Sequence, residues 1–310
     1  MPKQTRYEDP VLSRVALGYR MANGVGFELF PRVEVVKTSG KVLTFGKEAF
    51  RLIDTRRAPG SAIKSVMVGG GTEPIALYQD NLNGKVPREW LRDAADIPAL
   101  NHQTRAINMV MNQFSLQLEV QQAELARNTA NYGNNHHTTL GGSDQWSDKA
   151  NSSPKEDIDA GREAVRSEIG LYPNKATFGA KAWTAFKNHP ETIAHFKYSG
   201  VKSITTEMAA EYLEVKKVVV GEAVYAADGT ENPELVDVWG GDVILAYVPS
   251  ETESFIDVPS FGYTYELIGS PLVEEGWFDK SCNSWLYPTE VNRRPYVTGM
   301  DAGFLIKAAV

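Results

Sequence analysis

The most constraining feature of the sequence is a long helical pattern between Leu100 and Asn128. Pro98 precedes it and Gly133 follows it, as expected at the two ends of a helix. At 1.5 Å per residue such a helix is about 40 Å long, longer than most helices in globular domains. Its apolar positions, separated by 7, 4, 3, 4 and 7 residues, form one narrow stripe that predicts a helix lying along a surface: Leu100, Ile107, Met111, Phe114, Leu118 and Leu125.

The composition indicates a folded chain and excludes an ordinary nucleic-acid binder. Of 310 residues, 42% are hydrophobic and 23% charged, which is enough for a sizeable core in one or two domains. The 32 lysines and arginines are outnumbered by 39 aspartates and glutamates, so the net charge is −7 and no basic surplus can neutralise phosphates. A single cysteine, Cys282, favours a reducing compartment. No signal peptide or membrane span is found, so we expect a soluble cytosolic chain that contacts no membrane.

The first third of the chain predicts an arm followed by a projecting loop. Residues 1–32 contain only short apolar pieces, so we expect an extended arm that lies on its own body or on a neighbouring subunit. Strand-like runs at 33–36 and 42–45 flank Ser39-Gly40 and predict a β-hairpin. The long polar stretch that follows predicts a loop. It carries the dense basic cluster of the chain, which is either solvated or docked on an acidic surface of another subunit: Arg51, Arg56, Arg57 and Lys64.

Beyond the long helix, helices and strands are mixed without regular alternation, which predicts an α+β fold. Helices are expected at 155–170, 180–187 and 205–213. Strands are expected at 216–224 and 243–248 and through most of the C-terminal third.

No motif indicates catalysis or a bound cofactor. The P-loop, the zinc-protease histidine pair, the nucleophile elbow and the Rossmann glycine pattern are all missing from the sequence. His136 and His137 lie in a polar loop without the neighbouring ligands of a metal site, so we interpret them as solvent-facing. His189 and His195 are interpreted as structural or exposed, and carboxylates such as Asp157 as capping or solvated groups. We predict no catalytic, cofactor-binding or metal-binding residue and no cofactor.

An ordered series of short motifs resembles the major capsid proteins of tailed bacteriophages. The motifs are individually weak, but together they span most of residues 33–310. Upstream they include Arg56-Arg57-Ala58-Pro59-Gly60 and a long helix with Glu119 and Glu124. The central and C-terminal motifs are Trp146-Ser147-Asp148, Ser152-Ser153-Pro154, Asp157-Ile158, Gly170-Leu171-Tyr172-Pro173-Asn174, His189-Pro190, Val218-Val219-Val220-Gly221-Glu222-Ala223 and Ala302-Gly303-Phe304-Leu305-Ile306-Lys307.

This resemblance implies the Hong Kong 97-like capsid fold. Its expected parts are an N-terminal arm at 1–32, an extended β-hairpin loop at 33–85, a peripheral domain at 86–175 with a spine helix at 99–130, an axial domain at 176–255, and return strands at 256–310. The resemblance implies a major capsid protein that self-assembles into pentamers and hexamers of an icosahedral shell. That shell encloses phage double-stranded DNA without sequence-specific binding, and the protein is part of a virion assembled in the host cytoplasm. The contact candidates are then Arg51, Arg56, Arg57 and Lys64.

The resemblance also implies partners. Because only about 32 residues precede the loop, we expect a separate scaffolding protein, together with a portal. A decoration protein is a further candidate partner that the sequence does not decide. Neither Lys47 nor Lys64 can be paired with a particular asparagine, so no covalent crosslink is predicted. Two alternatives stay open: an encapsulin-type compartment with the same fold and an enzyme cargo, and, less favoured, a soluble enzyme built from scattered acidic residues and histidines.

Overall fold

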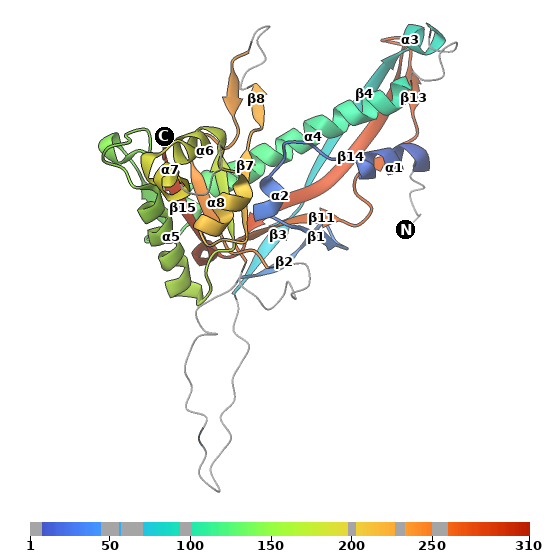
Figure 1. Cartoon of the computed structure of the whole chain (residues 1–310). Helices are drawn as coiled ribbons and strands as arrows, with labels where there is room; N and C mark the ends of the chain where they lie inside the picture. The colour runs from blue at the N-terminus through green and yellow to red at the C-terminus, as the bar shows by residue number, and fades with distance from the viewer. Residues whose placement is uncertain are drawn as a thin grey trace.

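The computed structural model describes residues 8–44, 56, 71–93, 101–197, 203–226, 233–249 and 260–310. They form an elongated half, in which one long helix runs along a sheet, and a broader half in which four helices surround a second sheet (Figure 1). The mixture of helices and strands confirms the α+β prediction.

The long helix is α4 (His102–Arg127), which confirms the prediction from the apolar stripe. It begins after Asn101, whose side chain accepts a hydrogen bond from the Thr104 amide at 3.0 Å. The stripe faces the protein, since the four central apolar side chains are each at most 5% exposed: Ile107, Met111, Phe114 and Leu118.

Helix α4 lies on a six-stranded sheet whose longest member is β14 (Ser284–Val297). The helix approaches this sheet closely at Gly84, where an added Cβ would lie 3.3 Å from the Ala106 Cβ. The strand order is β1-β11-β14-β12, and β13 and β4 also pair with β14. The remaining bounds are β1 (Arg32–Val35), β4 (Tyr78–Pro87), β11 (Gly262–Leu267), β12 (Leu272–Val273) and β13 (Trp277–Asp279).

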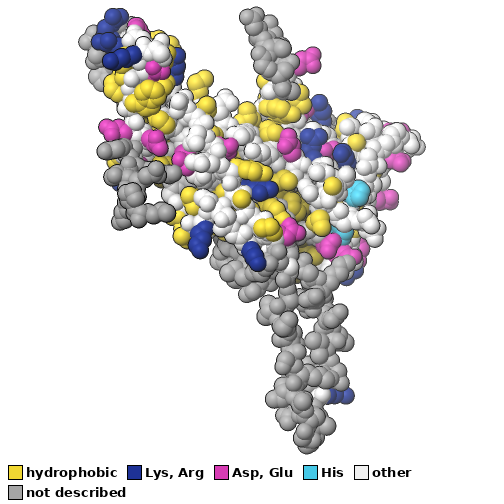
Figure 2. Space-filling view, turned by 180° about the vertical axis from the view of Figure 1, so that it is seen from behind, with side chains coloured by type: hydrophobic (Ala, Val, Ile, Leu, Met, Phe, Trp, Pro, Cys, Tyr) yellow, Lys and Arg dark blue, Asp and Glu magenta, His cyan; other side chains and the backbone are white. Residues whose placement is uncertain are grey.

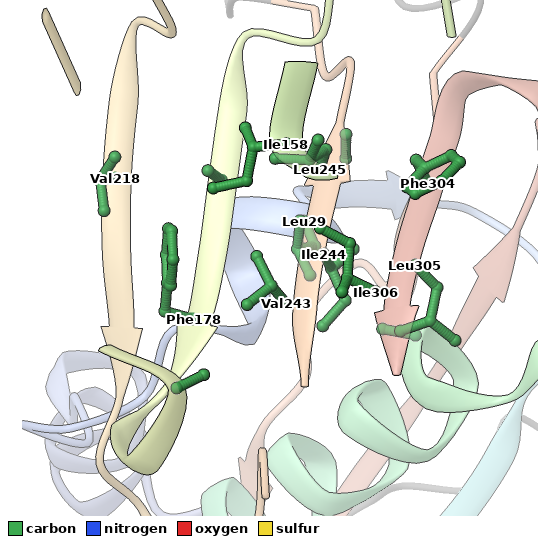
Figure 3. Packing of buried hydrophobic residues seen from close by; sticks show 14 of the residues in the cluster. Leu29, Ile158, Phe178, Val218, Val243, Ile244, Leu245, Phe304, Leu305 and Ile306 are labelled. Carbon is green, nitrogen blue, oxygen red and sulfur yellow. The ribbon is translucent and has the colours of Figure 1, made fainter. Parts of the chain in front are cut away.

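The second sheet has five strands in the order β5-β15-β10-β6-β7. Its central strand β10 (Val243–Ala246) is fully buried, as expected for a continuous apolar run covered on both faces. Phe178, Ile244 and Leu305 from three neighbouring strands pack in this core together with Ile158 (Figure 3). The other strands are β5 (His137–Thr139), β6 (Lys175–Gly179), β7 (Lys217–Gly221) and β15 (Gly303–Lys307).

Four helices surround this sheet: α5 (Pro154–Ile169), α6 (Ala180–Lys187), α7 (Pro190–Phe196) and α8 (Thr206–Tyr212). The predicted bounds of α5, α6 and α8 are correct within one residue at each end, whereas no bounds were predicted for α7. The strand expected at 216–224 is divided into β7 and the start of a two-stranded hairpin, β8 (Val224–Ala226) and β9 (Leu235–Asp237).

The prediction of a β-hairpin that turns at Ser39-Gly40 is wrong. Both residues lie inside β2 (Ser39–Thr44), which pairs antiparallel with the distant strand β3 (Gly71–Ala76). Strand β1 instead pairs in parallel with β11. Alternating apolar residues identified these segments as strands, but alternation does not specify the pairing partner, and the Ser-Gly pair was misread as a turn.

The prediction of an extended N-terminal arm at 1–32 is also wrong for its described part, residues 8–32. Two helices interrupt it, α1 (Pro10–Gly18) and α2 (Gly26–Leu29). The Asp9 carboxylate caps α1 by accepting the Val11 amide at 3.0 Å. Leu12 and Ala16 then pack in a small core beneath α4, so this segment lies on its own body.

Replacement of Phe178 by alanine should lower the free energy of unfolding by about 3–5 kcal/mol, because the ring is fully buried and contacts three other aromatic rings. Urea unfolding of the unassembled subunit measures the loss. Leu171→Ala, at a side chain that is 39% exposed, should change the value by less than about 0.5 kcal/mol. Equal losses in the two variants would contradict this assignment of the core.

Candidate assembly surfaces

The β2–β3 ribbon is the base of a long excursion of the chain. The register pairs Ser39 with Ala76 and Thr44 with Gly71, so the chain leaves the ribbon and returns to it at neighbouring positions. Of the four basic contact candidates, Arg56 lies within the described residues and is exposed. Arg51, Arg57 and Lys64 lie outside them, so the structure does not show whether the four come together.

Side chains of β14 fix this ribbon to the six-stranded sheet. Arg294 donates a hydrogen bond to the Ala76 carbonyl at 3.1 Å, and its guanidinium lies 4.7 Å from the centre of the Tyr78 ring. The Tyr296 hydroxyl donates to the Glu73 carboxylate. The base of the ribbon is therefore held by the body of its own subunit.

An acidic groove of about 800 Å³ lies beside the ribbon. Its charged lining residues are Glu73, Glu124 and Asp301 against a single arginine, Arg294, so the groove carries a net negative charge. Arginine side chains suit such a lining, since a guanidinium can donate two parallel hydrogen bonds to one carboxylate.

Ion pairs hold the second half of the arm. The Glu28 carboxylate pairs with Lys175 at 2.8 Å and with Lys217 at 2.6 Å, which joins α2 to the five-stranded sheet. Burial acts to raise the pKa of Glu28, but the two lysines outweigh this effect and lower the pKa below its usual value. Arg32 pairs with the buried Glu266 at 2.6 Å and joins β1 to β11.

A buried carboxylate, Glu119, lies where the arm, α4 and the broader half of the molecule meet. It is 3% exposed and accepts three N–H groups: the Val25 amide at 2.8 Å, the Gly26 amide at 3.0 Å and the Trp239 indole at 2.7 Å. Two of these donors are at the start of α2, which has no side-chain cap of its own. Burial raises the pKa of Glu119, and the three hydrogen bonds oppose that rise.

Gln122, one turn along α4, extends the same polar contact. Its amide donates to the Thr264 hydroxyl at 2.9 Å, and that hydroxyl donates to the Phe30 carbonyl at 3.0 Å. Gly26 is required here, since an added Cβ would lie 2.0 Å from the Gln122 amide oxygen. The arm therefore fits α4 only through a residue without a side chain.

The C-terminal end of α4 is clamped to the broader half by Arg127. Its guanidinium pairs with Asp242 at 2.6 Å and donates to the Val238 carbonyl at 2.9 Å. Asp242 also accepts the Ala308 amide at 2.8 Å. Gly240 has a positive φ of 57°, and a Cβ there would meet Arg127 at 2.4 Å, so glycine is needed on both counts.

Three of the side chains that the sequence analysis considered, His136, His189 and Asp157, have hydrogen-bond partners within the protein. The expectation that His136 faces solvent is wrong: it is 2% exposed, and its Nδ1 lies 3.0 Å from the Gly303 carbonyl, because β15 covers the loop. His189 is buried and accepts the Glu191 amide at the start of α7, which confirms a structural role. Asp157 accepts the Trp146 indole N–H at 2.8 Å. Within the described residues, no group of three metal-ligating side chains is found and no helix has the length and apolar character of a membrane span.

Sequence reasoning named Glu119 only as part of the family resemblance, and it missed the anchoring role of Glu119, Gln122 and Arg127. One signal was available for Gln122. The apolar stripe skips from Leu118 to Leu125, and Gln122 occupies the helical position between them, where a fully buried amide completes the buried face. The partners of all three come from distant parts of the chain, so no local pattern in the sequence could pair them.

Comparison with known proteins identifies the family. A profile of the family described as phage major capsid protein E matches residues 119–308. The major capsid protein of Burkholderia phage BcepMu is 34% identical over 308 residues, which cover 97% of this chain and 96% of that protein. The chain belongs to the phage major capsid protein E family.

A major capsid protein is a structural component of the phage virion, and its copies form the capsid shell. A crystal structure of a phage-related protein from Bordetella bronchiseptica matches this chain with a TM-score of 0.84 and 38% identity, and the match covers 99% of each chain.

More distant structures share the fold alone. The mature capsid of bacteriophage PhiM1 matches with a TM-score of 0.52 and 14% identity over 94% of this chain and 88% of that one. An encapsulin complex from Synechococcus elongatus matches with a TM-score of 0.51 and 12% identity, and the match covers 97% of this chain and 95% of the encapsulin chain. Because the fold occurs in both kinds of shell, the sequence relatives decide between them, and they favour the phage capsid over the encapsulin alternative.

The Glu28 ion pairs predict a pH-dependent anchor of the arm. The lowered pKa means that their stabilisation is present above the unfolded-state pKa of about 4.3 and is lost as the pH falls through the folded-state value. Glu28→Gln should lower the free energy of unfolding by about 1 kcal/mol at pH 7, and the difference from the parent should shrink steadily as the pH falls below about 4.3. Urea unfolding at several pH values measures this, and a pH-independent difference would contradict it.

Glu119→Ala should lower the free energy of unfolding by about 3 kcal/mol or more, because it leaves three buried or partly buried N–H groups without an acceptor. Glu124→Ala is the matched control on the same helix, since Glu124 is exposed, and should cost less than about 0.5 kcal/mol. Urea unfolding measures the stability, and limited trypsin digestion at Arg14 and Arg20 measures release of the arm. An arm as protected in the Glu119 variant as in the control would exclude the anchoring role.

Proposed function

We propose that copies of the capsid protein close into pentamers and hexamers, and that the shell encloses double-stranded phage DNA without sequence-specific contacts. The observation that carries the proposal is the β2–β3 ribbon, which forms a sheet of its own and bounds the excursion with the basic cluster. The net charge of −7 supports the enclosing role. A wall that bound packed phosphate tightly would hinder both packaging and release of DNA.

The contacts in this proposal are heterologous, with different surfaces of each copy facing one another. The basic cluster of one copy, Arg51, Arg56, Arg57 and Lys64, docks on the acidic groove of its neighbour, lined by Glu73, Glu124 and Asp301. Each contact is weak, but a closed shell repeats it many times and becomes stable as a whole.

Further parts of the proposal rest on the family resemblance. The subunit is a structural protein without catalytic activity that assembles in the host cytoplasm on a separate scaffolding protein and meets a portal. Its division into an arm at 1–32, a loop at 33–85, a peripheral domain at 86–175, an axial domain at 176–255 and return strands at 256–310 belongs to the same proposal. Analysis of immature particles tests the scaffolding partner, because a long pre-form of this chain would exclude it.

Electron microscopy of the purified protein tests the central claim. We expect closed shells of megadalton mass, and DNA inside the particles isolated from phage. A catalytically active species of 34.2 kDa that never assembles would contradict the proposal and favour the soluble-enzyme alternative.

Reversal of the loop charge should block assembly. The double variant Arg56→Glu with Arg57→Glu places acidic side chains against the acidic groove, so the subunit should fold but form no shells in sedimentation and electron microscopy. The matched control, Lys37→Glu with Lys41→Glu, makes the same change of charge at exposed sites near the base of the ribbon and should assemble.

A compensating exchange sharpens this test. Glu73→Arg with Glu124→Arg, added to the loop variant, restores opposite charges across the contact and should recover shells. Normal shells from the loop variant alone would show that the basic cluster is solvated.

A further inference from the structure

The end of the elongated half that carries α3 (Arg88–Asp93) and β13 exposes three tryptophans. Trp90 is 57% exposed, Trp277 50% and Trp285 36%, and together they are half of the six tryptophans in the chain. Hydrophobic side chains gather at this end with lysines and arginines among them (Figure 2). Tryptophan is buried to a large extent in most proteins and is enriched where two proteins bind, so this surface needs an occupant.

The tryptophans are divided between the two faces of the sheet. Trp285 pairs with Val86 and with Phe278, and Val86 is buried beneath α4, so Trp285 and Phe278 belong to the face that α4 covers. The Trp285 and Phe278 rings contact each other, with centroids 5.8 Å apart. Trp277 pairs with Leu286 and alternates with Phe278, so it lies on the opposite face.

Trp90 belongs to the α4 side. Its ring centroid lies 5.8 Å from that of His102, the first residue of α4. We therefore name two patches: a helix-side patch with Trp90, Trp285 and Phe278, and a sheet-side patch with Trp277 and Leu286.

The sheet-side patch also carries a cation. Lys85 pairs with Leu286 across β4 and β14, which places it on the face of Trp277. Because a cation binds favourably over an aromatic face, this lysine complements the tryptophans of the helix-side patch.

The two patches are held rigidly. The Arg88 amide donates to the Asn283 carbonyl at 3.1 Å, and the Asn283 side chain donates to Glu89 at 2.7 Å, which fastens α3 to the turn between β13 and β14. Asp279 accepts the Ser281 amide at 2.8 Å within that turn. A surface that is already ordered loses little conformational entropy when it binds.

We propose that this aromatic end is a contact between copies of the capsid protein, in which the helix-side patch of one copy packs on the sheet-side patch of the next. The inference rests on the proposed shell, which supplies a second copy beside every subunit. A two-fold contact of one patch with itself would leave the other patch in water, whereas a heterologous contact covers both. The occupant is thus another copy of this chain, and the tryptophans anchor the contact.

A double-mutant cycle on assembly tests this pairing. Trp90→Ser and Trp277→Ser each weaken the same contact, so each should raise the critical concentration for shell formation by about tenfold or more. The double variant should raise it by clearly less than the product of the two factors, because both residues act across one contact. Factors that multiply would overturn the pairing, and unchanged critical concentrations would overturn the contact itself.

Three controls separate this inference from other causes. Ile268→Ser, at a side chain that is 56% exposed outside the two patches, should leave the critical concentration unchanged, and Trp277→Phe should retain most of the contact. The melting temperatures of the unassembled variants should stay within a few degrees of the parent, because the mutated side chains are exposed. If the parent chain forms no shells, the proposed function fails; if the parent assembles and the variants assemble equally well, only this inference fails.

Tryptophan fluorescence tests whether a second copy is the occupant. Shells assembled from the purified chain should emit at shorter wavelength than free subunits and should be less quenched by iodide, since the exposed indoles become buried. The change should be smaller in Trp90→Phe with Trp277→Phe. Indoles that stay accessible to iodide in closed shells would overturn the proposal and assign the surface to a different protein.

Discussion

The arrangement of the subunit depends on one buried carboxylate. Glu119 receives N–H groups from the arm and from Trp239 in the broader half, so one side chain of α4 joins three parts of the chain. A charged group can remain buried only if donors replace its hydration, and the donors here are fixed by backbone geometry and by an aromatic ring packed against Gly221. Helix α4 thereby acts as a common axis: the six-stranded sheet lies along it, the arm crosses it, and Arg127 ties its end to the second sheet.

This arrangement suits a protein that must form a shell. The buried anchors keep residues 8–35 on their own subunit, which leaves other surfaces for contacts with neighbours. The two surfaces proposed for such contacts differ in chemistry: an acidic groove beside the ribbon and an aromatic end on the elongated half. Because charge and aromatic packing respond differently to salt, the two proposed contacts would provide separate sources of specificity and adhesion.

The sequence predicted the elements well and their partners poorly. The stripe from Ile107 to Leu118 predicted α4 because helical periodicity is a local property, and the apolar run Val243–Ala246 predicted a buried strand for the same reason. Strand pairing is not local, so the partners of β1 and β2 were misassigned. The exposure of His136 was misjudged because it depends on β15, more than 160 residues away. The basic cluster could be named from the sequence, whereas the acidic groove draws its carboxylates from three distant segments and could not be.

The register of the β2–β3 ribbon has a consequence for how such subunits can diverge. Since Thr44 and Gly71 are paired, the two points between which the chain departs and returns are already fixed beside each other. Loop-closure entropy grows only logarithmically, by about 0.6 kcal/mol for each doubling of length, so residues can be added or removed between these points at little cost to the rest of the fold. In the proposed shell, the reach of this segment toward a neighbouring subunit can then change by insertion or deletion while the core of the subunit stays the same. The ribbon is also a natural position at which to graft a foreign peptide onto the shell.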